Sequence, residues 1–168
     1  PSACNNNWEL MKYIFKNYKC NIHISLGMTT ISEEKKIVAI AKKFNANKRT
    51  ILYACTSDYP VQPDDICLLE ITNLIKKYGK TVKAIGFSGH HHGISADIAA
   101  ATLGATWIER HFTIDRTMKG TDHAASLEPD GTRRLKRDLD LLSQTLKFKP
   151  KEILPCELEQ RKKLKFSN

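Results

Sequence analysis

The residues best suited to chemistry lie between Gly86 and Glu128, in the stretch GFSGHHHGISADIAAATLGATWIERHFTIDRTMKGTDHAASLE. It contains five of the six histidines of the chain and carboxylates at Asp97, Glu109, Asp115, Asp122 and Glu128. Imidazoles and carboxylates bind divalent metals and act as general acids or bases. The stretch therefore suggests metal or phosphate chemistry.

Two of these histidines, His90 and His111, each follow an apolar run that is typical of a buried strand. If the two strands are neighbours in a barrel, both rings approach a common point. Two imidazoles that leave coordination positions open suit a divalent metal that also takes water and a substrate oxygen. The alternative is that His111 satisfies a core hydrogen bond while His90 begins a solvated loop.

The remaining histidines have weaker claims on a metal. Consecutive loop residues cannot all face one ion, so we expect His91 and His92 to be exposed or outside the ligand set. His123, beside Asp122, either contacts a substrate or caps a loop. His23 lies inside a predicted strand, where a structural role is expected.

Glu109 precedes His111 by two residues, so both side chains point to the same side of an extended strand. A carboxylate beside a metal is a candidate general acid or base. The alternative is an ion pair with an inward-facing Lys or Arg. By the same alternation, Arg110 points outward.

Four hydroxyls are expected at or near successive strand ends: Ser2, Ser25, Ser57 and Ser88. Together with backbone N–H groups they could hold a phosphate or a carboxylate. Any one of them alone is equally well explained as a turn or cap residue.

The elements that position these residues alternate along the chain. Strands are predicted over 21–27, 50–55, 82–87 and 106–109, and helices over 8–18, 30–44, 63–79, 95–104 and 130–146. Caps are expected at Asn7, at Thr30 with Glu33, and at Ser95, and Pro63 is expected in the first turn of its helix. Helices between successive strands predict a parallel sheet with right-handed crossovers.

Two architectures fit this order: a four-stranded doubly wound sheet, or the C-terminal half of a (β/α)8 TIM barrel. A complete barrel needs about 250 residues, so the second would be a fragment. Unusual polar residues follow every strand, which favours the half barrel, because a barrel gathers all strand ends on one active face. The common glycine-rich nucleotide motifs do not occur in the sequence.

Composition sets broader limits. The chain has 168 residues and a net charge of +9, concentrated from Arg133 to Asn168, where a solvated helix face and linker are more plausible than a nucleic-acid site. No apolar run is long enough for a membrane span. Five cysteines without a C-x-x-C pair favour a reducing, cytoplasmic setting, with Cys55 and Cys67 acting as small hydrophobes.

The segments GFSGHHHGI, IERHFTID, KGTDHAASLEPD and ILPCELEQRKK resemble the sialic acid synthase family, that is, the N-acetylneuraminate synthases and their legionaminate and pseudaminate relatives. PSACNNNWELM, ISLGMTT and ACTSDYP extend the resemblance upstream. The resemblance implies a phosphoenolpyruvate-dependent, C–C bond-forming transferase. Its second substrate is N-acetylmannosamine or a related N-acyl sugar, and it makes a nonulosonic acid with release of phosphate.

The resemblance also assigns roles to residues. It implies Mn²⁺ or Mg²⁺ held by His90 and His111, with Glu109 as the catalytic carboxylate. Contacts to phosphoenolpyruvate are expected from Ser2, Ser25, Ser57 and Ser88, and contacts to the sugar from Tyr59 and Asp122. The chain departs from the family pattern at Leu26, at Ser57 and at the pair His91-His92.

The same resemblance implies the domain organisation. Residues 1–147 are expected to be a partial synthase barrel, and residues 148–168 a basic linker toward an antifreeze-like (SAF) domain that is missing. We expect the full-length enzyme to be a homodimer without nucleic-acid or membrane partners, and the 168-residue chain to be inactive alone. The alternative is a non-catalytic or split-subunit half barrel that binds a complementary chain.

Overall fold

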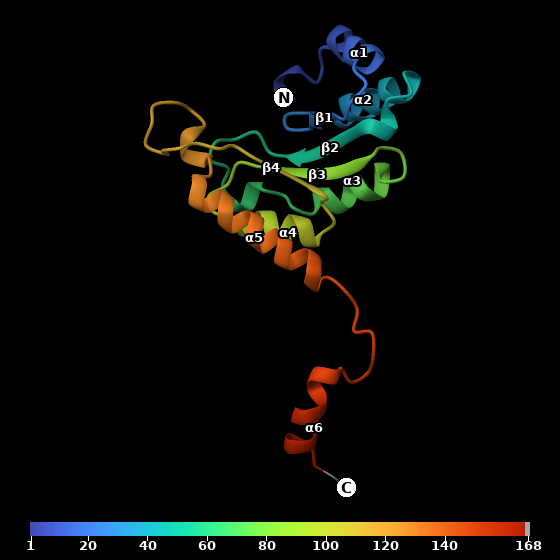
Figure 1. Cartoon of the computed structure of the whole chain (residues 1–168). Coiled ribbons are helices and arrows are strands. Elements are labelled where there is room, and N and C mark those ends of the chain that lie inside the picture. Colours follow the sequence, from blue (N-terminus) through green and yellow to red (C-terminus); the bar gives the residue numbers. More distant parts are fainter. Residues whose placement is uncertain (167–168) are drawn as a thin grey trace.

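The computed structural model describes residues 1–166, which form a four-stranded parallel sheet alternating with helices, half of a (β/α)8 barrel (Figure 1). The strands occur in the order β1 (Ile22–Ser25), β2 (Thr50–Cys55), β3 (Ala84–Gly89) and β4 (Trp107–Arg110). The helices are α1 (Trp8–Asn17), α2 (Ile31–Lys43), α3 (Glu70–Tyr78), α4 (Ser95–Thr102), α5 (Pro129–Thr145) and α6 (Leu158–Leu164). Neighbours in the chain are therefore neighbours in the sheet, which confirms the half barrel.

The core lies between the sheet and the helices that connect its strands. Alternate strand residues face these helices: Ile22 and Ile24 of β1, Leu52 and Ala54 of β2, Ile85 and Phe87 of β3. Phe15 of α1, Ile37 of α2 and Ile71 of α3 are fully buried against them. Because each strand gives one set of side chains to this core, the other set is free for the opposite face of the sheet.

Most element bounds agree with the sequence patterns. The Asn7 side chain accepts from the Leu10 N–H at 3.1 Å, and Thr30 with Glu33 forms a complete capping box. Two expectations were wrong. Pro63–Asp65 forms only a 3₁₀ turn, because Cys67 adopts φ +51° and a left-handed residue ends the helical path, so α3 begins at Glu70. Ser95 is the first helical residue rather than the cap, since Ile94 occupies that position.

The opposite face of the sheet carries an aromatic layer. The Tyr53 hydroxyl lies 2.7 Å from His23 Nδ1, and the His23 ring meets the Trp107 ring edge-on at a centroid distance of 5.0 Å. Tyr53, Gly86 and Trp107 are partners in register across three strands. A Cβ on Gly86 would lie 2.6 Å from the Tyr53 ring and 2.8 Å from the Trp107 carbonyl oxygen. Glycine at this position therefore makes room for the tyrosine ring.

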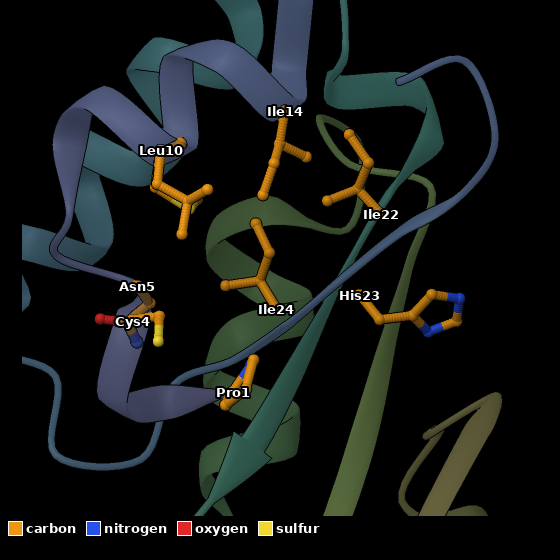
Figure 2. A pocket seen from close by; sticks show the side chains of 9 residues that line it. Pro1, Cys4, Asn5, Leu10, Ile14, Ile22, His23 and Ile24 are labelled. Atoms are coloured by element: carbon orange, nitrogen blue, oxygen red, sulfur yellow. The ribbon is translucent and has the colours of Figure 1, made fainter. Parts of the chain in front are cut away.

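One of the two edges of the half barrel lies at β1. A cavity of about 80 Å³ separates this strand from α1, and Figure 2 shows Leu10, Ile14, Ile22 and Ile24 around it, with His23 turned away. β1 pairs with β2 alone in the sheet formed by the described residues. The apolar cavity thus lies next to an edge strand whose other side is unpaired.

The C-terminal segment departs from the barrel after α5, which packs against α4. Figure 1 shows α6 away from the sheet. The boundary after residue 147 falls just beyond α5, and the assignment of 148–168 as a linker stays a prediction. Within residues 1–166, no helix is long and apolar enough to cross a membrane.

Candidate active site

The candidate site is built on one row of residues at the carboxyl ends of three strands. Cys55, Ser88 and Glu109 are direct partners in the β2–β3 and β3–β4 register. All three point away from the helix-facing core, as alternation requires. The Ser88 hydroxyl donates a 2.8 Å hydrogen bond to Glu109 Oε1, which holds the carboxylate at the mouth of the half barrel.

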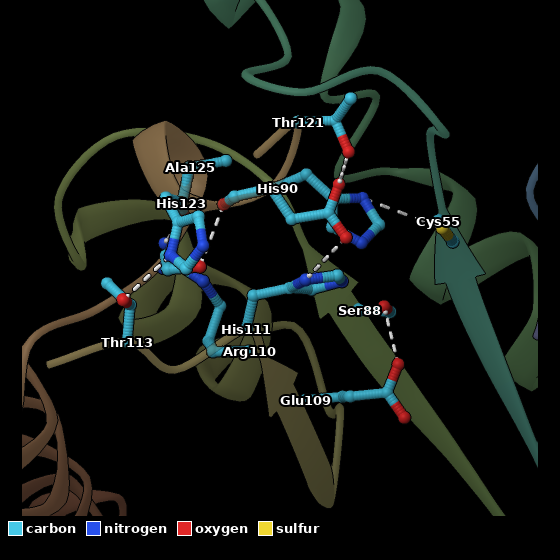
Figure 3. A network of polar contacts seen from close by, with 12 residues as sticks. Cys55, Ser88, His90, Glu109, Arg110, His111, Thr113, Thr121, His123 and Ala125 are labelled. Carbon is cyan, nitrogen blue, oxygen red and sulfur yellow. Dashed lines mark hydrogen bonds and ion pairs between the residues drawn. The ribbon is translucent and has the colours of Figure 1, made fainter. Parts of the chain in front are cut away.

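His90 and His111 continue the same alternation, one step beyond Ser88 and Glu109. Their rings meet edge-on with a centroid distance of 5.1 Å (Figure 3). His90 is buried and His111 is partly exposed. The structure therefore brings together the two histidines that the sequence singled out, from the ends of neighbouring strands.

In each of the two rings, Nδ1 lies near an oxygen atom. His90 Nδ1 lies 2.9 Å from the Thr56 carbonyl oxygen, and His111 Nδ1 lies 3.4 Å from Asp122 Oδ2. Because the Thr56 carbonyl oxygen only accepts, the His90 proton belongs on Nδ1 and the lone pair on Nε2. Metal-binding histidines in proteins are oriented in this way.

The side chains at this site can be compared with the ligands that the metal ion expected from the sequence would need. Among residues 1–166 there is no group of three or more His, Cys, Asp or Glu side chains placed to hold an ion. The two imidazoles nevertheless fit a divalent ion that takes its other ligands from water and substrate oxygens. His90 and His111 are the residues that would hold it.

Tyr59 and Asp122 reach the histidines from two different loops. The Tyr59 ring lies over His90 at a centroid distance of 4.4 Å and near His111 at 5.6 Å. Asp122 belongs to the long loop between His111 and Leu127. A backbone hydrogen bond closes this loop, since the Leu127 N–H donates to the His111 carbonyl oxygen at 2.8 Å. This closure carries Asp122 to the His111 ring.

The serine hydroxyls gather in a second cluster around Gly27. Ser2 Oγ donates to Ser25 Oγ at 3.0 Å, and a Cβ on Gly27 would lie 2.8 Å from Ser2 Oγ and 2.1 Å from Ser57 Oγ. Only glycine leaves this space open between the hydroxyls. Ser88, by contrast, is bonded to Glu109 rather than to this cluster.

Cys55 links the hydroxyl cluster to the histidines. Its Sγ lies 3.9 Å from Ser57 Oγ and 4.0 Å from His90 Nδ1. Burial raises the pKa of Cys55, but hydrogen bonds with His90, Ser25 and Ser57 outweigh burial and lower this pKa to about 7. Burial by itself lowers the pKa of His90. The hydrogen bonds of His90 with Cys55 and with the Thr56 carbonyl outweigh burial, so the pKa of His90 is raised.

Several expectations need correction. Of the two alternatives expected for His91 and His92, His92 is exposed, whereas His91 is buried against Asp97 and Arg110 on the helix side of β3. Cys55 is part of the polar row rather than a plain hydrophobe, and Cys67 is exposed rather than buried in an apolar run. Arg110 points away from the site, as alternation predicts, and its side chain is buried beside Asp97.

Asn5 and His123 hold two loops of the site through side-chain hydrogen bonds. Asn5, buried, donates to the Ser25 carbonyl oxygen at 2.9 Å and to Thr29 Oγ1 at 2.6 Å, which fixes the turn after β1. His123 bonds Thr113 Oγ1 at 2.8 Å through Nδ1, so it braces its loop. The pattern of Asn5 in PSACNNN carried no signal for this contact, because it depends on a turn 20 residues away.

A half barrel with imidazoles, a carboxylate and hydroxyls at the carboxyl ends of its strands has the active face of a barrel enzyme. Residues 1–151 match the NeuB family, and the chain belongs to that family.

Relatives of known name agree with this membership. The chain is 41% identical over 163 residues to human N-acetylneuraminate-9-phosphate synthase, covering 97% of this chain and 44% of that protein. It is 36% identical over 136 residues to N,N'-diacetyllegionaminic acid synthase of Campylobacter jejuni, covering 80% of this chain and 40% of the relative. The chain thus spans less than half the length of these relatives, which are synthases of sialic-acid-type sugars.

Solved structures agree as well. An N-acetylneuraminic acid (sialic acid) synthetase from Leptospira borgpetersenii, crystallised with citrate, superposes with a TM-score of 0.81 at 31% identity, covering 97% of this chain and 56% of that one. The spore coat polysaccharide biosynthesis protein spsE of Bacillus subtilis gives a TM-score of 0.72 at 30% identity, covering 93% and 39%. The fold and family predicted from the sequence are confirmed.

Proposed function

We propose that this chain supplies the C-terminal half of the active face of a nonulosonic acid synthase. In this proposal phosphoenolpyruvate condenses with N-acetylmannosamine or a related N-acyl sugar, with addition of water and release of phosphate. The observation that carries it is the pair His90 and His111, 5.1 Å apart between ring centroids, with the Ser88–Glu109 hydrogen bond on the adjacent row. Membership of the NeuB family supports it.

The cofactor proposed is Mn²⁺ or Mg²⁺ on His90 and His111. Bound there, a divalent ion would act as a Lewis acid that polarises the sugar carbonyl and as a template for both substrates. The chain's own part is to present the two rings: the Thr56 carbonyl holds the proton on His90 Nδ1, and Asp122 lies 3.4 Å from His111 Nδ1.

The substrate contacts divide between the two clusters. Ser2, Ser25 and Ser57 surround the space above Gly27, where hydroxyl donors suit the phosphate or carboxylate of phosphoenolpyruvate. Tyr59 and Asp122 border the histidines and are assigned to the sugar. Ser88 then has an indirect role in our proposal, because its hydroxyl is used to hold Glu109.

Glu109 is assigned to proton transfer. Its carboxylate lies on the same row as Ser88 and next to the histidine pair, so it can hold or move a proton at the reacting atoms. The C=C electrons of phosphoenolpyruvate form the bond from its third carbon to the sugar carbonyl carbon, and the carbonyl oxygen takes up a proton as its π bond opens. Water adds at the second carbon and gives up a proton, and the bond from that carbon to the phosphate oxygen breaks as phosphate leaves.

The test uses the full-length protein with both substrates and Mn²⁺, and measures phosphate release and the nonulosonic acid by mass spectrometry. We expect activity that is lost with EDTA and in His90→Ala and His111→Ala. His92→Ala is the matched control, since His92 is exposed beside the same site. No phosphate release from the unmodified protein with any N-acyl mannosamine-type sugar or its 6-phosphate would refute the proposal.

The activity is expected to need more than residues 1–168. Trp107 and His23 on the inner face are exposed, and the relatives carry more than twice the length of the matched region. We propose that the 168-residue chain alone is inactive and that the full-length enzyme is a cytoplasmic homodimer. Condensation catalysed by the purified 168-residue chain would contradict the first of these.

The edge of the sheet favours one second candidate, a split-subunit half barrel that binds a complementary chain. β1 pairs only with β2 among the described residues, so its other edge is a surface with which another strand could pair. Co-purification of this chain with a separately encoded N-terminal half barrel would support that candidate. A continuous reading frame joining both halves would exclude it.

A further inference from the structure

A buried charged cluster lies directly behind the candidate site, between the sheet and α4. Arg110 Nη1 lies 2.5 Å from Asp97 Oδ2, with side-chain exposures of 5% and 0%. His91 completes the cluster: its Nε2 lies 3.2 Å from Arg110 Nη1 and 3.4 Å from Asp97 Oδ2. None of these three side chains can reach substrate, because they face the helix side of the strands.

The guanidinium of Arg110 also donates to backbone carbonyls of two loops. Nη2 donates to the His91 oxygen at 2.7 Å and to the Ala125 oxygen at 3.3 Å, and Nη1 donates to the Gly93 oxygen at 2.8 Å. One side chain thus joins the β3–α4 loop, the loop that returns to α5, and the end of β4. Figure 3 shows Arg110 between His111 and the loop that carries His123 and Ala125.

Each of these attachment points adjoins a residue of the candidate site. Arg110 itself lies between Glu109 and His111, and the His91 carbonyl follows His90. Ala125 belongs to the turn that begins at Asp122, since the Ala125 N–H donates to the Asp122 oxygen at 3.2 Å. Movement of either loop would therefore shift a side chain that faces the histidine pair.

The cluster is poorly arranged as a device for stability alone. Three of its buried atoms, His91 Nδ1, Asp97 Oδ1 and Arg110 Nε, have no hydrogen-bond partner among the described residues. Buried ion pairs are often replaceable by apolar side chains without loss of stability. An apolar side chain could not replace the several N–H donors of the Arg110 guanidinium, which reach backbone carbonyls of both loops.

We propose that Arg110 is a positioning residue that fixes His90 and Asp122 relative to His111, with Asp97 anchoring its guanidinium. This inference rests on the proposed function, in which those residues hold the metal ion and the sugar. Its effect is on geometry: the two Nε2 atoms keep one spacing, and Asp122 stays at the His111 ring.

The experiment compares three variants of the full-length protein. Arg110→Lys keeps the charge but loses the forked donors, and the pair Asp97→Leu with Arg110→Met removes both charges so that none is left buried alone. Arg133→Lys is the control, because Arg133 pairs with Asp130 in an exposed i,i+3 contact on α5. Mn²⁺ affinity is measured by electron paramagnetic resonance, and loop opening by hydrogen exchange of peptides covering 90–94 and 122–126.

In both Arg110 variants we expect Mn²⁺ affinity to fall by about 10- to 100-fold, the range found when groups that orient metal ligands are removed. Exchange in the two loops should rise by about tenfold or more while the strands stay protected. Arg133→Lys should change neither quantity. If a folded Arg110 variant keeps the Mn²⁺ affinity within twofold of the unmodified protein, the positioning role is refuted, even if exchange rises.

Failure of the proposed function gives a different result. If the unmodified protein binds no Mn²⁺ and releases no phosphate, the assignment of His90 and His111 to a metal falls. Hydrogen exchange of the two loops in Arg110→Lys then decides the inference by itself. A rise in exchange confined to residues 90–94 and 122–126 supports the positioning role of Arg110, and unchanged exchange overturns it.

Discussion

Ser88 Oγ lies 2.8 Å from Glu109 Oε1, and the two residues are direct partners in the register of β3 and β4. The bond exists because both strands end on the same row and both side chains leave the sheet on the same face. It fixes the orientation of the one carboxylate that shares a row with both Ser88 and Cys55.

The first prediction concerns this carboxylate. Glu109→Gln keeps the shape and the hydrogen bond from Ser88 but cannot take up a proton. We expect kcat to fall by about 10²- to 10⁴-fold, the usual contribution of a general acid or base, with Mn²⁺ affinity nearly unchanged. Ser88→Ala, which only releases the carboxylate, should cost less. A kcat for Glu109→Gln within threefold of the unmodified enzyme would remove Glu109 from proton transfer.

The second prediction concerns the thiol of Cys55. Its pKa is lowered to about 7, because hydrogen bonds with His90, Ser25 and Ser57 outweigh the opposing effect of burial. The thiolate is the reactive form, so alkylation by iodoacetamide in the presence of EDTA should rise with pH and be half-maximal near pH 7. His90→Gln removes one hydrogen-bond partner and should move the midpoint to higher pH. Peptide mass spectrometry separates Cys55 from the four exposed cysteines; a midpoint in the wild-type protein near pH 9 would contradict the contact.

The third prediction concerns the space at Gly86. An alanine Cβ would lie 2.6 Å from the Tyr53 ring and 2.8 Å from a backbone oxygen of β4, so ring or strand must move. Overpacking of this kind costs about 1–3 kcal/mol, seen as a lower midpoint in chemical unfolding. Gly131→Ala is the control: its Cβ would meet only the flexible Leu127 side chain at 3.3 Å within α5, and alanine favours helix. Equal midpoints for the two variants would show that the tyrosine ring does not need the glycine.

The fourth prediction compares two helix starts. Thr30 caps α2 by accepting from the Glu33 N–H at 3.2 Å, while Ser95 makes no side-chain cap bond at the start of α4. Thr30→Ala should therefore lower the free energy of unfolding by about 0.5–2 kcal/mol. Ser95→Ala should have almost no effect. A larger loss in Ser95→Ala than in Thr30→Ala would mean that Ser95 acts as a cap after all.

Local pattern was sufficient for much of the barrel. The apolar runs and helix stripes placed four strands and five of the helices, because side-chain period and capping depend on residues within a few positions of one another. It failed at Pro63, where a favourable helix start is followed by a left-handed residue at Cys67. A backbone reversal of this kind at a non-glycine residue leaves no signature in the sequence.

The sequence by itself determined which residues share a face. Glu109 and His111 had to lie opposite Arg110, since alternation along a strand is a property of the backbone alone. Only the tertiary structure decided what those faces meet. That His91 is buried with Asp97, that Cys55 lies beside His90, and that Asp122 returns to His111 all depend on strand register and loop closure. Those contacts join residues 6 to 35 positions apart, beyond the reach of any local period, and only the packed barrel fixes them.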